Sequence, residues 1–184
     1  MNLKHVSQID GIRINQIKSI FDERGTFFKI YPLHELKESL NSIVLSVNPV
    51  VGTVRGLHFQ VEPFAEEKLI TCIQGSVFDV FVDLRPKSKT LGRWASFELS
   101  ATSAKQIYLP KGIAHGFQTL VPNSILHYSL SSMYSSESSY TINPFGNLGI
   151  EWPLKVTAVS ERDIQGISFA NAAQAYTESL DFGL

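Results

Sequence analysis

The stretch SVFDVFVD, residues 76–83, has the strict alternation of a β-strand. Alternation predicts two faces, one formed by Val77, Asp79, Phe81 and Asp83 and the other by Phe78, Val80 and Val82. Because apolar side chains occur on both faces, both sides of this strand are expected to be covered. A buried carboxylate without a partner is costly, so Asp79 is expected to point into a cavity.

The same pattern extends along the chain in both directions. Short runs rich in Val, Ile, Phe and Tyr, separated by Gly, Pro, Ser and Asn, predict strands over residues 42–47, 53–59, 68–73, 76–84, 95–99, 106–109, 116–120 and 124–130. No helical periodicity lies between them, which favours an antiparallel sandwich or barrel. Short helices are expected outside this block, over 32–40 and around 170–180, and Ser160 is a candidate helix cap.

Composition restricts the class of protein. A chain of 184 residues with 43% hydrophobic content is long enough for one filled core, so residues 1–184 are expected to form a single domain. Sixteen basic and seventeen acidic residues give a net charge of -1, which indicates neither a nucleic-acid partner nor a membrane surface bound through bulk charge. We find no signal peptide and no apolar run of the roughly 20 residues that span a bilayer, so a cytoplasmic protein is expected.

His58 lies in VRGLHFQ, residues 54–60, and three roles are open for it: a packed core histidine, a metal ligand or a catalytic base. For one isolated histidine, the packed interpretation is the better one. Its neighbours Arg55 and Lys68 favour a functional role. Arginine suits bidentate recognition of phosphate or carboxylate, and lysine can polarise a carbonyl oxygen.

A second histidine, His115, follows the turn marked by Pro110 and Gly112. If His58 and His115 both face inward from separate strands, chance explains the pair poorly. Alternation places Tyr128 on the face opposite to His127, the residue before it in the chain. On that face its phenol could act as a general acid.

A metal site ranks below acid–base catalysis. Cys72 is the only cysteine, which excludes an internal disulfide and a multi-thiolate site. The remaining histidines, His5, His34 and His127, form no ligand pair of the usual spacing.

Six motifs in order give the chain a family resemblance: DERGTFF, VRGLHFQ, EEKLITCIQGSVFDVFVDLR, LGRWASFELSA, YLPKGIAHGFQTL and LGIEWP. Together they resemble the dTDP-4-dehydrorhamnose 3,5-epimerases of the cupin superfamily, over residues 12–163. The resemblance implies an all-β fold, a cupin-type, jelly-roll-like antiparallel barrel with short peripheral helices. It also implies a nucleotide-diphosphate sugar as substrate, a homodimer with exchanged N-terminal strands, and work without metal or cofactor.

The resemblance also implies roles for individual residues. His58 matches the catalytic base, Asp163 its acidic partner, Lys68 the lysine near the C4 oxygen and Tyr128 the proton donor on the opposite face. The implied substrate-binding set is Arg24, Phe27, Arg55, Gln60, His115, Tyr134 and Arg162, of which the first two reach the site from the partner subunit.

The implied reaction is inversion of C3 and C5 in a nucleotide-linked 4-keto-6-deoxyhexose. A hydrogen beside a ketone is acidic only if the enolate is stabilised, so a base and a cation are both needed. An ordinary imidazole has a pKa of about 6.5 and is largely neutral at pH 7, as a base requires. By analogy with Asp163 and His58, we expect Asp79 to hold His115.

Alternatives remain open at this point. The fold also carries 3- or 5-monoepimerases, and a non-catalytic sugar-nucleotide-binding cupin and a metal-dependent cupin oxygenase remain possible. The chain departs from the family pattern at Lys29, Ile43, Leu45 and Met133, around the nucleotide end. These departures leave the nucleotide base open but do not touch the proton-transfer set.

Overall fold

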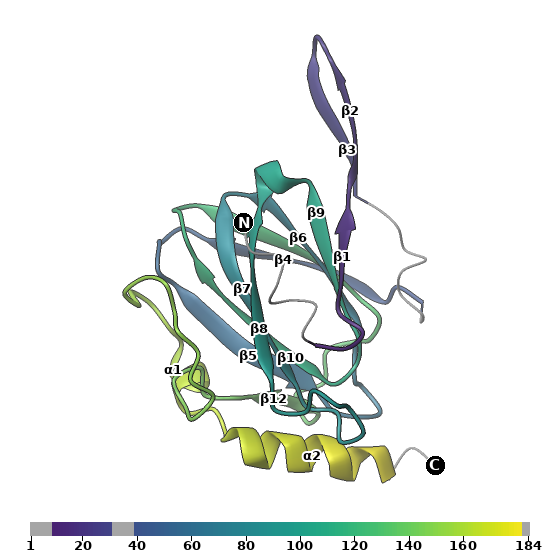
Figure 1. The fold of residues 1–184 in the computed structure, drawn as a ribbon, viewed down its shortest axis with the longest axis vertical. Helices are drawn as coiled ribbons and strands as arrows, with labels where there is room; N and C mark the ends of the chain where they lie inside the picture. The colour runs from purple at the N-terminus through teal and green to yellow at the C-terminus, as the bar shows by residue number, and fades with distance from the viewer. Residues whose placement is uncertain (1–8, 31–38, 182–184) are drawn as a thin grey trace.

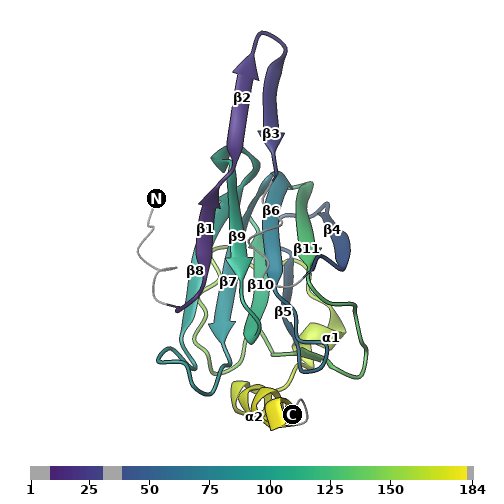
Figure 2. The ribbon, with the colours of Figure 1, turned by 90° about the vertical axis from the view of Figure 1, so that its right-hand side faces the viewer.

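The protein, described here from a computed structural model over residues 9–30 and 39–181, is built from two antiparallel sheets packed face to face (Figures 1 and 2). The strand order of the first sheet is β1 (Arg13–Gln16), β9 (Lys105–Leu109), β6 (Lys68–Gln74), β11 (Ser124–Leu130) and β4 (Ser42–Asn48). The second sheet has the order β12 (Ser139–Thr141), β5 (Val54–Gln60), β10 (Ile113–Thr119), β7 (Ser76–Asp83) and β8 (Trp94–Ser100). The predicted antiparallel cupin-type barrel is confirmed.

Strand β7 lies inside the second sheet and is covered on both faces, as its alternation predicts. Val77 and Phe81 pack in the core between the sheets. Val80 and Val82 pack on the outer face, in the cluster to which α2 (Phe169–Asp181) contributes. Burying both faces of a central strand removes a large apolar area from water, which is the main favourable term in folding.

Two helices follow the strands. The predicted cap Ser160 begins α1 (Glu161–Ile164), where its hydroxyl accepts the Asp163 N–H at 3.1 Å. The tail helix predicted around 170–180 is α2, which lies across one end of the barrel (Figure 1). None of the described helices is long and apolar enough to cross a membrane. The helix predicted over 32–40 falls mostly outside the described residues.

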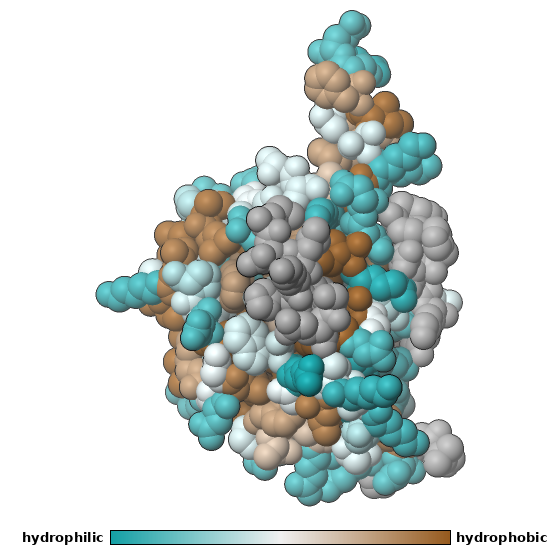
Figure 3. All heavy atoms as spheres, viewed as in Figure 1, coloured by the Kyte–Doolittle hydropathy of each residue, from teal (hydrophilic) through white to brown (hydrophobic). Residues whose placement is uncertain are grey.

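Strands β2 (Lys18–Asp22) and β3 (Gly25–Lys29) form a hairpin that projects beyond one end of the barrel (Figure 2). It pairs with neither sheet among the described residues. Several of its side chains are apolar and exposed, as the brown surface on the projection shows (Figure 3), and Phe21 and Phe27 are 80% and 66% exposed. An isolated two-stranded hairpin is marginally stable in water, so this one is expected to gain contacts from another surface.

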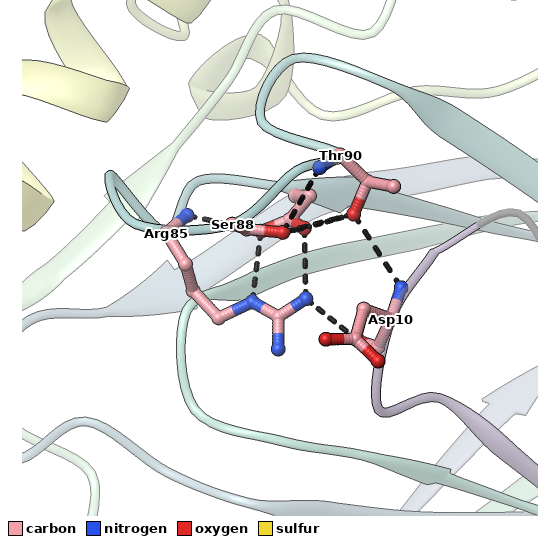
Figure 4. A network of polar contacts seen from close by, with 5 residues as sticks. Asp10, Arg85, Ser88 and Thr90 are labelled. Atoms are coloured by element: carbon pink, nitrogen blue, oxygen red, sulfur yellow. Dashed lines mark hydrogen bonds and ion pairs between the residues drawn. The ribbon is translucent and has the colours of Figure 1, made fainter.

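A buried carboxylate ties the loop after β7 to the start of the chain. Asp83 accepts hydrogen bonds from Arg85 Nε and Nη2 at 2.8 and 2.7 Å, and from the hydroxyls of Ser88 and Thr90 at 2.6 Å each. Arg85 Nη2 also donates to the backbone oxygen of Asp10 at 2.6 Å (Figure 4). Burial alone would raise the pKa of Asp83, but these donors outweigh it and the pKa lies below its usual range.

Candidate active site

A cavity of about 180 Å³ opens between the two sheets. It combines two histidines, a lysine, an arginine and a tyrosine, and its lining residues are Ser46, Arg55, His58, Lys68, His115, Gly116, Phe117 and Tyr128. His58 and His115 both line this cavity from separate strands, which is the condition under which chance explains the pair poorly. They are direct cross-strand partners on β5 and β10.

His58 forms a close pair with Asp163. Its Nε2 lies 2.7 Å from Asp163 Oδ1, across 105 positions of sequence. The His58 side chain is 43% exposed, whereas the Asp163 side chain is 4% exposed. The carboxylate is therefore shielded from water, while the imidazole remains accessible.

The local fold holds Asp163 in place on two sides. Its Oδ2 accepts the backbone N–H of Gly56 at 3.2 Å, and the Ser160 cap fixes the turn that carries it. Burial by itself would raise the pKa of Asp163. The hydrogen bonds from His58, Gly56 and Ser160 prevail, so its pKa is lowered and the group is ionised at neutral pH.

A β-bulge brings Arg55 and His58 to the same cavity. Three positions apart on a regular strand, these side chains would point to opposite faces. Strand β5 carries one more residue than β10 between the pairs His115–His58 and Phe117–Arg55, which marks the bulge. Gly56 lies in it at φ +100°, and a Cβ there would approach His115 O to 2.5 Å. Alternation alone would place Arg55 on the face opposite to His58, and the bulge instead brings it into the cavity.

Lys68 reaches the cavity from β6 of the first sheet. Its Nζ lies 3.1 Å from Glu66 Oε1 and 3.4 Å from the backbone oxygen of His58. The side chain is 8% exposed. The Lys68 ammonium, held this close to His58, is suited to stabilise a negatively charged oxygen on a bound ligand.

His115 is paired with Asp79, as expected. His115 Nε2 lies 2.6 Å from Asp79 Oδ1 in a fully buried setting. Burial raises the pKa of Asp79, although the charges of His115 and Lys68 oppose the shift. The second oxygen of Asp79 is buried and has no hydrogen-bond partner among the described residues.

Tyr128 lies across the cavity, on β11 of the first sheet. Its ring meets the His115 ring edge-on, with centroids 5.8 Å apart. Burial, reinforced by the charge of Asp79, raises the pKa of Tyr128 well above the ordinary value for a phenol. The hydroxyl is therefore protonated throughout the physiological pH range and can only donate its proton to a strong base.

Three predicted binding residues, Gln60, Tyr134 and Arg162, are not among those that line the cavity. Gln60 is buried, and its amide donates to the backbone oxygens of Phe64 and Met133 at 2.9 and 3.0 Å, which holds the loop that bears Tyr134. Arg162 donates to Ser139 Oγ at 2.9 Å, and 3.5 Å separates its Nη1 from the Tyr134 hydroxyl. Tyr134 itself is 66% exposed.

Arg24 and Phe27 do not reach the cavity of their own chain. Both line a separate hollow on the β2–β3 hairpin. Arg24 forms an exposed ion pair with Asp22 at 2.7 Å. Within one chain, therefore, these two predicted binding residues stand apart from the other candidates.

Sequence reasoning missed two residues that organise the site. Asn48 accepts a hydrogen bond from Arg55 Nε at 2.7 Å, and Gly56 provides both the bulge and the N–H that binds Asp163. Asn48 carries no local motif. Gly56 lies within VRGLHFQ, but a glycine in a strand does not by itself reveal a bulge or a bond to a distant carboxylate.

A second cavity and a cluster of metal ligands would be further candidates for a functional site. A larger cavity of about 600 Å³ lies beside the start of α2, between residues such as Asn143 and Phe169, and contains none of the predicted site residues. Across residues 9–30 and 39–181, no three histidine, cysteine, aspartate or glutamate side chains are grouped to hold a metal ion.

Comparison with known proteins adds independent findings. Residues 6–171 match the family described as dTDP-4-dehydrorhamnose 3,5-epimerase. The enzyme of that name from Sinorhizobium fredii is 37% identical over 162 residues, which cover 84% of this chain and 83% of that protein. A dTDP-4-dehydrorhamnose 3-epimerase from Streptomyces niveus is 35% identical over 161 residues, 84% of this chain and 77% of that protein. The structure of the 3,5-epimerase from Legionella pneumophila in complex with dTDP-4-keto-L-rhamnose superposes with a TM-score of 0.82 at 32% identity, covering 89% of this chain and 90% of that one.

Proposed function

The chain belongs to the dTDP-4-dehydrorhamnose 3,5-epimerase family, and we propose that it inverts C3 and C5 of a dTDP-linked 4-keto-6-deoxyhexose through an enolate. The observation that carries this proposal is the His58–Asp163 pair, which opens on a cavity that also holds Lys68 and Tyr128. C3 and C5 both adjoin the C4 ketone. A hydrogen on either carbon is therefore acidic once the developing enolate oxygen is stabilised.

His58 is the base in this mechanism. Its Nε2 is engaged by Asp163, which leaves Nδ1 to take the proton from carbon. The ionised Asp163 fixes the tautomer with the proton on Nε2 and stabilises the imidazolium that forms. The exposure of the imidazole to the cavity gives a substrate access to it.

Lys68 and Tyr128 complete the reaction. The Lys68 ammonium stabilises the enolate on O4. Tyr128 donates its proton to the carbon from the other side, since it belongs to the first sheet and His58 to the second. Removal from one face and delivery to the other invert the centre. His115, held by Asp79, packs against the Tyr128 ring and orients it.

The full site is proposed to require a second copy of the chain. Arg24 and Phe27 are exposed on a projecting hairpin and lie outside the cavity of their own chain. In a homodimer with exchanged N-terminal strands, they would contact the nucleotide diphosphate in the partner's cavity. Arg55, Gln60, Tyr134 and Arg162 would bind or frame the substrate from within one chain. A cytoplasmic location follows from the substrate, because a charged nucleotide does not cross a bilayer unaided.

The test is isotope exchange. Incubating the protein in deuterated water with dTDP-4-keto-6-deoxyglucose should place deuterium at C3 and C5, as followed by NMR. His58→Ala should abolish exchange at both carbons. Tyr128→Phe should impair inversion more than proton abstraction, and equal, mild losses in the two variants would contradict the assigned roles.

The same experiment separates the alternatives. A monoepimerase is the second candidate, because a relative named as a 3-epimerase is 35% identical to this chain. Deuterium at one carbon alone would support it. A panel of other 4-keto-6-deoxy nucleotide sugars tests the base. If no sugar exchanged at either carbon, a non-catalytic binding protein would remain.

A further inference from the structure

A buried amide holds the arginine of the cavity. Asn48, the last residue of β4, is 1% exposed, and its Oδ1 accepts the hydrogen bond from Arg55 Nε. Its Nδ2 donates to the backbone oxygens of Ser46 and Ser124 at 3.0 and 3.2 Å. Because a carbonyl only accepts and a guanidinium only donates, these partners leave one orientation for the amide. Asn48 thus meets Arg55 with a fixed, neutral oxygen.

We propose that Asn48 positions Arg55 and keeps its positive charge available for the diphosphate of the substrate. This inference rests on the proposed function. The contact with Asn48 uses only the Nε–H of Arg55, so the four N–H groups on the two terminal nitrogens remain for an anion. No ion pair to Arg55 exists within the described part of the chain. A guanidinium in this state is suited to bidentate binding of a phosphate.

Arg85 in the same molecule shows how an arginine behaves when its partner is a carboxylate instead of an amide. Its Nε donates to Asp83 Oδ1 at 2.8 Å, and its Nη2 to Asp83 Oδ2 at 2.7 Å. The carboxylate neutralises that arginine and commits it to a structural network. The Nε contact of Arg55 is nearly the same length, 2.7 Å, but its acceptor carries no charge. The difference between an amide and a carboxylate therefore separates an arginine poised for a ligand from an arginine that stabilises the fold.

Fixing Arg55 before the ligand arrives also favours binding. A free arginine side chain loses rotamer entropy when it is ordered, and the loss is among the largest of any side chain. The amide of Asn48 is itself locked by β11 through Ser124, so much of this ordering is already present in the folded chain. Binding of an anion then incurs less of that cost.

Calorimetric titration with dTDP tests the proposal. Asn48→Ala should weaken dTDP binding about tenfold, because Arg55 keeps its charge but is no longer held in place for its hydrogen bonds to the phosphate. Arg55→Ala should weaken it at least as much. If Asn48 acts through Arg55, adding Asn48→Ala to Arg55→Ala should cause no further loss. An undiminished effect of Asn48→Ala in the Arg55→Ala background would overturn the proposal.

A second variant keeps the shape of the side chain and changes its charge. Asn48→Asp should weaken dTDP binding at neutral pH, because the new carboxylate neutralises Arg55. Relative to the wild type at the same pH, affinity should recover in acid, where the protonated carboxyl can donate as the amide does. Equal affinity at every pH would contradict the inference. This variant also carries the test if Asn48→Ala does not fold.

Ser124→Ala is the matched control. It alters the same buried cluster, where Ser124 Oγ donates to Val121 O at 2.8 Å, but leaves the Asn48–Arg55 contact untouched. It should lower the melting temperature and leave dTDP affinity unchanged. If the wild-type chain failed to bind dTDP, the proposed function would fail. If the wild type and Asn48→Ala bound dTDP equally, only the positioning role would fail.

Discussion

At the scale of single residues, the Asp163 carboxylate shows why the site could be only partly predicted. His58 could be identified as a candidate base from its neighbours on one strand. Its partner lies 105 positions away, and only the family resemblance pointed to it. Asn48 gave no such indication, because its role follows from β4 and β5 meeting at the cavity. Contacts between distant strands are set by the fold and are not visible in local patterns.

Replacing Asp163 by asparagine tests the pairing. The variant loses the charge that stabilises the imidazolium, and its single amide oxygen cannot accept from both His58 and the Gly56 N–H, so the tautomer is no longer fixed. We expect kcat to fall by roughly 10³–10⁴-fold, the scale seen when an equivalent histidine loses its carboxylate. Affinity for dTDP should stay within about twofold, because Asp163 does not contact the nucleotide in the proposed mechanism. Loss of dTDP binding and kcat together would instead indicate a collapsed site.

At the scale of elements, the sequence pattern predicted eight strands, β4 to β11, with ends that differ from the observed ones by up to three residues. Segment 124–130 matches β11 throughout, whereas β10 begins at Ile113 rather than at the predicted residue 116. The sequence pattern did not predict strands β1, β2, β3 and β12, because they are short and mostly half-buried or exposed, so their alternation is weak. The bulge in β5 was also missed. A single inserted residue changes which face a side chain occupies, and alternation has no means of detecting it.

Gly56→Ala should disrupt this bulge. The alanine would have to adopt φ +100°, which L-residues rarely do, and its Cβ would lie 2.5 Å from His115 O. We expect destabilisation of about 3 kcal/mol, measured by denaturant unfolding, together with loss of dTDP binding through Arg55. Gly149→Ala is the control, because Gly149 also has positive φ, +66°, but has no atom within 4 Å of the added Cβ. It should cost about 1 kcal/mol. Similar costs at the two positions would rule out the steric explanation.

Asp83→Asn should make stability less dependent on pH. The pKa of Asp83 is lowered in the folded state, so its stabilising contribution is present above the unfolded value of about 3.9 and is lost as pH falls through the folded pKa. At pH 7 the variant should be less stable by about 3 kcal/mol, because the half-buried Arg85 loses its buried counter-charge. The gap between wild type and variant should narrow below about pH 4. A gap that stayed constant between pH 7 and pH 3 would contradict this assignment.

At the scale of the whole molecule, strand spacing predicted an antiparallel sandwich or barrel, whereas the cupin-type barrel and the exchanged N-terminal strands were implied only by the family resemblance. No sequence pattern distinguishes a hairpin that folds back on its own barrel from one that projects. The structure has the projecting form, with exposed aromatic side chains (Figure 3). Its role in a second copy therefore stays a prediction, which mixing of subunits can test.

Two inactive variants should restore activity when mixed. In the proposed homodimer, His58→Ala disables its own cavity, and Arg24→Ala disables the cavity of its partner. A mixed dimer would contain one cavity with both residues intact. Unfolding and refolding the two variants together should therefore recover part of the wild-type kcat, while each variant refolded alone should remain impaired. If the mixture showed only the average of its components, Arg24 would not act across subunits, and sedimentation would still report the oligomeric state.

The bulge at Gly56 has a spectroscopic consequence. The Gly56 amide is bonded not to a neighbouring strand but to the carboxylate of Asp163, at 3.2 Å. Its ¹H–¹⁵N resonance therefore reports on that carboxylate, which in turn forms a hydrogen bond with the proposed base, His58. The amide shift should move when His58 gains a proton, and its solvent exchange should quicken in Asp163→Ala. A single backbone signal thus allows the protonation cycle of the site to be followed without a label on the substrate.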